Sequence, residues 1–401
     1  MNQQRITGGI LLTEGGAYEG DLLLKDGKIE AIIARDTAVS SDYRVIDAAG
    51  LYVSPGFVDI HQHGGGGADY MDSDPDAYRK ITEAHLRHGT TAVMPTLLSA
   101  DTAALFRAID SYKAAKRDPR VRVSLLGLHI EGPYISPLQA GAQKPEHIRV
   151  FDPKEYGQIH AHAEGCIKRW SVAPEVDGAE AFARFANENG IILSIAHSNA
   201  DLDTVRSAFD MGFQHVTHLY SCTSTITRRG GFRVPGVLEA AFLLDGMNVE
   251  LIADGCHLPH SLLALVAKCK SPDRIALVTD AMRAAGEETK HSFLGSPDDP
   301  LPVVIEDGVA KMLDRTAFAG SIATADRLVR NMRESGTPLA DAVRMVTAYP
   351  IDMMHLDVKK GRLECGYDAD LCFFDEDIAV QRVFLMGEEA GVRGLAKGAK
   401  R

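Results

Sequence analysis

Short, almost entirely apolar segments recur along the middle of the chain and alternate with segments whose apolar residues repeat every three or four positions. The apolar segments predict eight strands, over Gly56–His63, Thr91–Leu97, Val123–Glu131, Trp170–Glu175, Ile191–His197, His215–Tyr220, Val249–Asp254 and Ile275–Asp280. The segments between them predict helices, for example over Pro75–His88, Thr102–Lys116, Ala179–Asn189, Leu202–Met211 and His260–Lys268. Buried strands that alternate with helices are typical of an α/β fold of the parallel (β/α)8, or TIM-like, barrel type. A doubly wound open sheet is the alternative, but no Gly-x-Gly-x-x-Gly sequence follows any strand.

The two ends of the chain have a different pattern. Residues 1–54 have the character of short strands joined by tight turns, with Asp26-Gly27 as a turn dipeptide. After the eighth strand we expect a hairpin over Pro300–Asp314 and then helices, and the tail returns to strands. Strand-rich ends that flank a barrel most simply pair with each other. We therefore expect a small β-sandwich domain made of residues 1–54 and 356–401, and a barrel domain over 55–355.

Composition narrows the class of protein. The chain has 401 residues, 45% of them hydrophobic and 24% charged, as in ordinary globular proteins. Its net charge of −12 disfavours binding to nucleic acid or to an anionic membrane, although a local arginine cluster can still bind an anionic substrate. The six cysteines show no C-x-x-C spacing, and no signal peptide or 18-residue apolar span is evident. We therefore expect a cytoplasmic protein with reduced thiols.

Polar side chains end most of the predicted strands. His61 and His63 are two residues apart at the end of the first strand, so both side chains project to the same side. The other predicted strand ends carry Glu131, His197, His218, Asp254 with His257, and Asp280. In a parallel barrel these ends meet at one rim, and imidazole and carboxylate groups are ligands of divalent metals. The pattern therefore predicts a metal centre at the carboxyl end of the barrel.

The order of these residues resembles that of a known family. The motifs are His-x-His, Glu131-Gly132-Pro133, His197, His218-Leu219-Tyr220, Asp254-Gly-x-His257 and Thr279-Asp280-Ala281. This set resembles the amidohydrolase superfamily and, within it, the N-acetylglucosamine-6-phosphate deacetylase family, over nearly the whole chain. The resemblance implies hydrolysis of the N-acetyl group of an amino-sugar 6-phosphate to give acetate and a free amine. It also implies a homodimer whose small-molecule partner is the phosphorylated sugar.

The same resemblance implies a set of metal ligands. Glu131, His197 and His218 correspond to the ligands of the principal metal. His61 and His63 would complete a second site, with Glu131 between the two. We therefore expect one or two divalent ions per subunit, with zinc as the first choice and iron, manganese or cobalt also compatible with these ligands.

Catalytic and substrate-binding roles follow from the resemblance as well. Asp280 is expected to be the general base, which takes a proton from the attacking water and delivers it to the leaving amine. The alternative role for Asp280 is that of a further metal ligand, and both roles are compatible. His257 stands where the family contacts the sugar and its phosphate, and a buried structural histidine is the alternative. Gln143 stands where many relatives have a histidine that polarises the carbonyl, and its amide can still donate to a developing oxyanion.

The phosphate-binding segment departs from the family pattern. Ser221 and Cys222 replace an Asn-Ala pair that helps to hold the phosphate. The following segment is longer than usual, and Arg229 or Arg233 can be the phosphate-binding arginine, which in the family reaches across a dimer interface. A solvated basic loop is the alternative. Arg283, where relatives have a small residue, would add an anion contact or narrow the pocket.

Three other functions stay open at this point. The altered segment permits N-acetylgalactosamine-6-phosphate or another N-acylated hexosamine as the substrate. A different amidohydrolase, such as a deaminase or an N-acyl amino acid deacylase, is more distant. A catalytically silent metal-binding protein is disfavoured, because Asp280 and the predicted ligands are all present.

Overall fold

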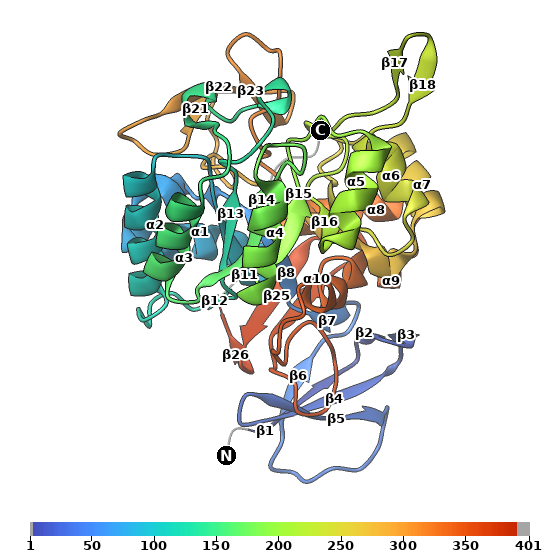
Figure 1. Cartoon of the computed structure of the whole chain (residues 1–401). Coiled ribbons are helices and arrows are strands. Elements are labelled where there is room, and N and C mark those ends of the chain that lie inside the picture. The colour runs from blue at the N-terminus through green and yellow to red at the C-terminus, as the bar shows by residue number, and fades with distance from the viewer. Residues whose placement is uncertain (1–2, 391–401) are drawn as a thin grey trace.

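A barrel of parallel strands forms the centre of the molecule (Figure 1). The computed structural model describes residues 3–390. The barrel strands are β8 (Phe57–Gln62), β11 (Thr90–Leu97), β13 (Leu128–Glu131), β14 (Ile167–Val172), β15 (Ile192–Ile195), β16 (Phe213–Val216), β19 (Asn248–Ile252) and β20 (Ile275–Val278), and a short strand, β12 (Ser124–Leu125), also pairs with β11. Each of the eight predicted strands is present, so the barrel prediction is confirmed. The predicted third strand is divided into β12 and β13, with Gly127 at a positive φ of 129° between them.

The barrel closes between its first and last strands at the carboxyl end only. There the Asp280 N–H donates to the His61 carbonyl oxygen at 2.9 Å. Toward the other end the two strands separate, and the Val58 N–H donates instead to the carbonyl oxygen of Val346 at 2.8 Å. The preceding residue, Met345, accepts from the Leu277 N–H of β20, also at 2.8 Å. The closure therefore fixes the backbones of His61 and Asp280 against each other, although 219 positions separate them in the sequence.

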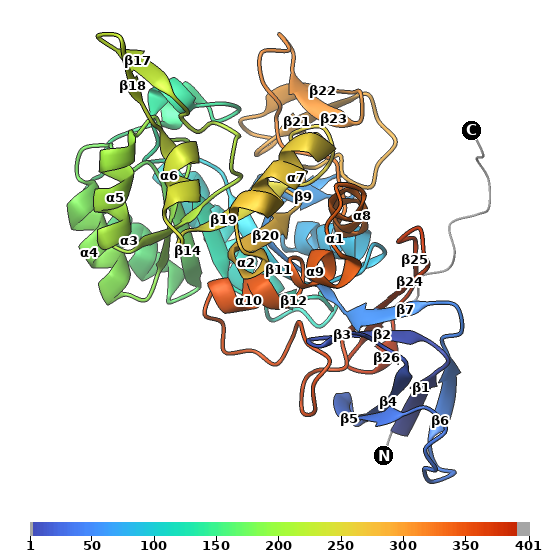
Figure 2. The same ribbon diagram turned by 90° about the vertical axis from the view of Figure 1, so that its right-hand side faces the viewer.

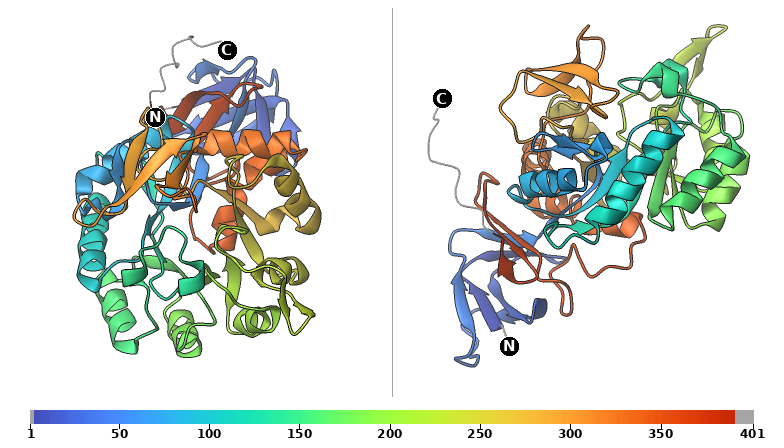
Figure 3. Two further views of the ribbon diagram at one scale, coloured as in Figure 1. Left: turned by 90° about the horizontal axis from the view of Figure 1, so that it is seen from above. Right: turned by 90° about the vertical axis from the view of Figure 1, so that its left-hand side faces the viewer.

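Helices surround the barrel, as the view from above shows (Figure 3, left). They are α1 (Pro75–Leu86), α2 (Thr102–Ala115), α3 (Pro153–Ala163), α4 (Ala179–Glu188), α5 (Leu202–Asp210), α6 (Val237–Leu243), α7 (His260–Cys269), α8 (Ala325–Glu334), α9 (Leu339–Arg344) and α10 (Ala348–Met353). Ile351 and Met353 of α10 share a buried cluster with the barrel residues Val58 and Ile252. Because these apolar residues fill the amino-terminal part of the barrel, a polar site has room only toward the carboxyl end.

The two ends of the chain pair with each other, as expected. Strand β24 (Leu371–Phe374) runs antiparallel to β7 (Tyr52–Pro55), and the sheet continues through β2 (Ile10–Thr13), β3 (Gly16–Tyr18), β25 (Val380–Leu385) and β26 (Glu388–Glu389). A second sheet contains β1 (Gln3–Thr7), β4 (Gly20–Lys25), β5 (Lys28–Ala34) and β6 (Arg44–Asp47). Residues of both ends, such as Ile6 and Phe373, share one buried cluster. This β domain lies below the barrel (Figure 2), and residues 391–401 of its predicted range lie outside the described residues.

Several extensions lie at the carboxyl end of the barrel, opposite the β domain (Figure 1). They are the hairpin β17 (Thr227–Arg229)–β18 (Phe232–Val234), the pair β9 (Gly64–Gly65)–β10 (Ala68–Asp69), and a sheet of β21 (His291–Leu294), β22 (Leu301–Glu306) and β23 (Val309–Met312). The hairpin predicted over Pro300–Asp314 is β22–β23. Among residues 3–390, no helix has the length and apolar character needed to cross a membrane.

Candidate active site

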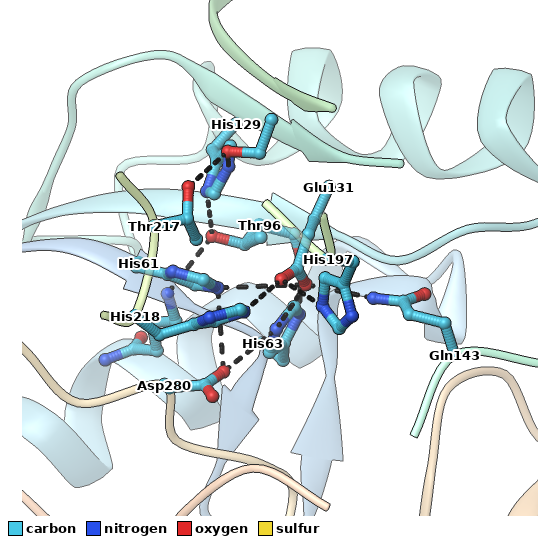
Figure 4. Close-up of polar contacts among 12 residues, drawn as sticks. His61, His63, Thr96, His129, Glu131, Gln143, His197, Thr217, His218 and Asp280 are labelled. Atoms are coloured by element: carbon cyan, nitrogen blue, oxygen red, sulfur yellow. Dashed lines mark hydrogen bonds and ion pairs between the residues drawn. The ribbon is translucent and has the colours of Figure 1, made fainter. Parts of the chain in front are cut away.

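Four imidazoles converge on the carboxylate of Glu131 at the carboxyl end of the barrel (Figure 4). Glu131 Oε1 lies 2.9 Å from His218 Nε2 and 3.2 Å from His197 Nε2. Glu131 Oε2 lies 3.2 Å from His63 Nε2 and 3.8 Å from His61 Nε2. All five side chains are buried. One carboxylate therefore faces a different pair of imidazoles with each of its oxygens.

Asp280 completes a second group on the side of His61 and His63. Its Oδ1 atom lies 3.1 Å from His63 Nε2 and 3.5 Å from His61 Nε2. Two groups result, one of His61, His63 and Asp280 and the other of Glu131, His197 and His218, and the potential ligand atoms within each lie within 4.8 Å of one another. His61 Nε2 is buried and has no hydrogen-bond partner among the described residues. A buried polar atom of this kind is costly, and a cation between the groups would satisfy it.

The outer nitrogen of each imidazole has its own acceptor. The Nδ1–H of His61 donates to Glu250 Oε2 at 3.1 Å. The other three Nδ1–H groups donate to backbone carbonyl oxygens: His63 to Thr96 at 3.2 Å, His197 to Gln139 at 2.8 Å, and His218 to Ser221 at 3.2 Å. An acceptor at Nδ1 keeps the proton on that nitrogen and leaves the Nε2 lone pair available. All four available lone pairs point toward the interior of the site, which is the arrangement that metal ligation requires.

The backbone turns sharply at three of these residues. His197, His218 and Asp280 have φ angles of 45°, 33° and 46°, in the left-handed region that residues other than glycine rarely adopt. Each lies two residues past the last residue of its strand. Such a conformation costs on the order of 1–3 kcal/mol and tends to occur at functional sites. Here it accompanies the turn of the chain at the rim, where the three side chains face the site.

The facing imidazoles keep both carboxyl groups ionised despite their burial. Burial raises the pKa of Glu131, but the facing imidazoles of His61, His197 and His218 have the larger effect and hold that pKa well below its usual range. In the same way His61 and His63 hold the pKa of Asp280 below its usual value against the effect of burial. Burial lowers the pKa of His63, but Asp280 and Glu131 more than offset it and raise that pKa to about 10. The carboxylates therefore favour positive charge at this point, and a divalent ion would displace the extra proton from His63.

A pocket with a volume of about 320 Å³ opens above these groups. Ser221, Cys222 and His257 line it, as does Gln143. The His257 Nδ1–H donates to Asp254 Oδ2 at 2.9 Å, which fixes the ring at the pocket wall. The predicted substrate-binding residues at these positions therefore lie beside the predicted metal ligands.

Gln143 is held in place by both ends of its amide. Its Nε2 donates to Glu131 Oε2 at 3.1 Å, and its Oε1 accepts from the Ser99 N–H at 3.0 Å. The structure therefore directs the donor end of this amide toward the centre of the site. A group that binds beside Glu131 would meet an N–H donor there.

Arg229 and Arg233 are not brought to the pocket within one chain. Both lie on the β17–β18 hairpin and are exposed, and neither lines the pocket. Arg229 Nη1 lies 3.5 Å from Asp201 Oδ2, an exposed contact. The hairpin projects away from the barrel (Figure 1).

The expectation for Arg283 is wrong. This residue is buried, pairs with Asp72 and donates to the Gly295 carbonyl oxygen at 3.0 Å. Its guanidinium also lies 4.0 Å from the centre of the Phe293 ring. Arg283 does not line the pocket. Its guanidinium is paired with Asp72 and fastens the β21–β22 segment to the rim, so it does not narrow the pocket.

Sequence reasoning missed two sets of residues. Tyr220 and Phe318 line the pocket, and Phe318 lies 4.8 Å from the ring of His257. Beneath the imidazoles lie Arg169 and Glu250, which form a fully buried ion pair. A signal for Glu250 was present, because it is a charged residue within a strand predicted to be buried on both faces, whereas Arg169 directly precedes the predicted fourth strand.

Comparisons with known proteins support the expected resemblance. The sequence profile described as the amidohydrolase family matches residues 52–398. The N-acetylglucosamine-6-phosphate deacetylase of Lysinibacillus sphaericus is 32% identical, over 94% of this chain and 95% of that protein. The N-acetylgalactosamine-6-phosphate deacetylase of Escherichia coli O157:H7 is 30% identical, over 95% of this chain and 97% of that protein.

Solved structures agree with the sequence comparisons. A structure of N-acetylglucosamine-6-phosphate deacetylase from Pasteurella multocida has a TM-score of 0.88 at 28% identity and covers 96% of this chain and 99% of its own. The Mycobacterium smegmatis deacetylase in complex with N-acetyl-D-glucosamine-6-phosphate has a TM-score of 0.88 at 30% identity, with coverages of 97% and 99%. The barrel with a β domain is therefore an arrangement that these proteins share.

Proposed function

The chain belongs to the amidohydrolase family, and from that premise we propose that it is a metal-dependent deacetylase of an N-acetylated amino-sugar 6-phosphate. N-acetylglucosamine-6-phosphate is the proposed substrate, and glucosamine-6-phosphate and acetate are the products. The observation that carries this proposal is the convergence of four imidazole Nε2 atoms and Asp280 around Glu131 at the base of a pocket. Relatives with this activity match almost the full chain.

The residues present fit one or two divalent ions. Glu131, His197 and His218 would hold the principal ion, and His61 and His63, with Asp280 beside them, would hold a second. Zinc is our first choice, and iron, manganese and cobalt also suit imidazole and carboxylate ligands. When bound, such an ion supplies Lewis-acid activation of water and of the amide carbonyl.

The protein groups then move the proton and orient the amide. Asp280 is ionised and buried at the base of the pocket, so it can accept a proton from the attacking water. The same carboxyl group delivers that proton to the nitrogen of the leaving amine. Gln143 directs its amide N–H groups toward the position where negative charge develops on the carbonyl oxygen. His257, on the pocket wall, is proposed to contact the sugar.

The sugar phosphate needs positive or polar partners that one chain does not bring to the pocket. Ser221 and Cys222 supply polar groups at the pocket wall. We propose that Arg229 or Arg233 supplies the charge from a second subunit, because both lie on a hairpin that projects from the barrel. A homodimer follows from this arrangement. We also propose a cytoplasmic location, since all six cysteines are unpaired.

An acetate-release assay tests the proposed function. The panel would contain the gluco and galacto 6-phosphates, their unphosphorylated sugars and an N-acetylated amino acid, each tested after metal depletion and repletion. We expect release from N-acetylglucosamine-6-phosphate that requires added metal. Preference for the galacto phosphate would support the second candidate, which the Escherichia coli O157:H7 relative and the unusual hairpin segment favour. Activity on the amino acid alone would contradict both.

A further inference from the structure

Directly beneath the four imidazoles, the interior of the barrel is charged. Arg169 of β14 and Glu250 of β19 form an ion pair there, and their side chains are 0% and 2% exposed. Barrel interiors are usually filled by branched apolar side chains. A buried ion pair rarely adds stability over apolar residues of similar volume, because both charges lose their hydration. Stability therefore does not account for this pair.

Glu250 connects the ion pair to one imidazole of the site. Its Oε1 atom faces Arg169, and its Oε2 atom accepts from His61 Nδ1 at 3.1 Å. The other three imidazoles donate to neutral backbone carbonyl oxygens. His61 is therefore the single imidazole of the four that is held by a carboxylate. An anionic acceptor at Nδ1 fixes the ring and makes Nε2 more basic, and both effects improve a metal ligand.

Arg169 is itself held rigidly. Its Nη2 donates to Ser194 Oγ and Thr217 Oγ1, both at 2.9 Å, and these two hydroxyl oxygens lie 2.7 Å apart. The ion pair with Arg169 and the hydrogen bond from His61 together occupy both carboxylate oxygens of Glu250. Glu250 is thus an anion held in one orientation by a network that spans the barrel interior.

We propose that Arg169 and Glu250 are a positioning pair that controls metal binding at the group of His61, His63 and Asp280, and so whether the site holds one ion or two. The inference rests on the metal-dependent function proposed above. His61 Nε2 has no hydrogen-bond partner among the described residues, so hydrogen bonding orients this ring from its Nδ1 side. In the other ligand group, the described contact with the ion pair is that of the His218 backbone N–H, which lies 3.4 Å from Glu250 Oε2.

A Glu250→Gln variant separates the two groups of ligands. Glutamine has nearly the same shape but only one oxygen, so either the His61 N–H or the Arg169 N–H must face an NH₂ group. We expect the metal-depleted wild-type protein to bind two equivalents of Mn²⁺, measured by the electron paramagnetic resonance signal of free Mn²⁺. In the variant, the affinity for the first equivalent should be preserved and that for the second should fall about 10- to 100-fold. The spin-coupled signal of two neighbouring Mn²⁺ ions should fall with it.

Two further variants control for structural damage. Ser194→Ala removes a partner of Arg169 but leaves the contact between Glu250 and His61, so it should bind both equivalents. The double variant Arg169→Met, Glu250→Met leaves no unpaired buried charge, and it should fold and bind one equivalent tightly. Preserved first-equivalent binding shows that the barrel is intact, a point that matters because Glu250 Oε2 also lies 3.4 Å from the His218 backbone nitrogen.

The outcomes are distinct from those of the activity assay. Tight binding of both equivalents by Glu250→Gln or by the double variant overturns the inference, whatever the deacetylase activity. Binding of a single equivalent by the wild-type protein overturns it as well. A wild-type protein that binds two equivalents but releases no acetate contradicts the proposed function and leaves the inference on metal binding in place.

Discussion

At the scale of single residues, Asp280 is constrained through its side chain, its backbone conformation and its N–H group. Its carboxylate faces His61 and His63, its backbone is in the left-handed region, and its N–H closes the barrel against β8. These constraints hold an ionised carboxylate at the base of the pocket. The arrangement suits a base that must accept a proton and return it without moving.

We expect Asp280→Asn to lower kcat for acetate release by about 10²- to 10⁴-fold, because the amide keeps the size of the side chain but cannot accept the proton. The rate would be measured at saturating substrate, with the metal content determined on the same sample. An unchanged rate in a fully loaded variant would show that another group is the base. Loss of rate together with loss of the metal would instead indicate a ligand role.

The convergence of most of these side chains could be predicted from the sequence, for a physical reason. Strand ends of a parallel barrel share one rim, so the periodicity that predicts the strands also brings Glu131, His197 and His218 together. The role of Arg283 could not be derived in this way, because its partner Asp72 lies 211 positions earlier and only the folded rim brings them together. The contact between Glu250 and His61 could not be derived from the sequence for the same reason, since it joins β19 to β8 in the interior of the folded barrel.

At the scale of elements, helix α1 supports the loop that follows β8. His85 of α1 is buried, and its Nε2–H donates to the Gly64 carbonyl oxygen at 3.0 Å, immediately after His63. Burial lowers the pKa of His85 to about 4, so the ring is neutral in the folded protein at physiological pH. A helix outside the barrel thereby fixes the chain beside a predicted metal ligand.

This contact predicts a pH-dependent stability. The unfolded chain protonates His85 below its usual pKa of about 6.5, whereas the folded protein does so only near pH 4, so the unfolded state binds more protons between these values. Stability should therefore fall with pH in this window, by about 2 kcal/mol from this residue between pH 7.5 and pH 5. His85→Gln keeps a donor to Gly64 but does not titrate. Urea unfolding at both pH values should show a smaller pH effect in the variant, and equal effects would contradict the assignment.

The β17–β18 hairpin illustrates what periodicity cannot show at this scale. Its segment Thr227-Arg-Arg-Gly-Gly-Phe-Arg-Val has little apolar alternation, because no face of the hairpin packs against its own barrel. Phe232 is 80% exposed on it. An exposed aromatic ring between arginines is what a contact with a second subunit would bury.

The proposed role of this hairpin makes a kinetic prediction. Arg229→Ala or Arg233→Ala, whichever removes the phosphate contact, should raise KM for the phosphorylated substrate about 10- to 100-fold, since a hydrogen bond to a charged group is lost. Turnover of the unphosphorylated sugar should stay the same, because that substrate makes no such contact. Phe232→Ser is the matched variant for the subunit contact, and sedimentation would compare its subunit association with that of the wild-type protein. If both arginine variants keep the wild-type KM, the phosphate is held by other groups.

At the scale of the whole molecule, strand β24 joins the two cores. Phe373 packs in the core of the β domain, whereas Cys372 and Phe374 belong to the core of the barrel. Alternate side chains of one strand therefore enter two hydrophobic clusters. The strand-rich character of both ends predicted their pairing, but this division of β24 depends on the barrel helices that cover one face, which local sequence does not reveal.

Shared burial along β24 predicts that the barrel and the β domain unfold together. Phe374 is buried, with its ring 5.7 Å from that of Tyr52 and 6.3 Å from that of Phe57. We expect Phe374→Ala to lower the free energy of unfolding by about 3–5 kcal/mol and to leave a single transition, measured by calorimetry and by circular dichroism. Phe373→Ala, whose ring lies 5.0 Å from that of Phe384 in the other core, is the matched control and should lower the same transition. Two separated transitions, with Phe373→Ala shifting only one of them, would show that the ends fold independently of the barrel.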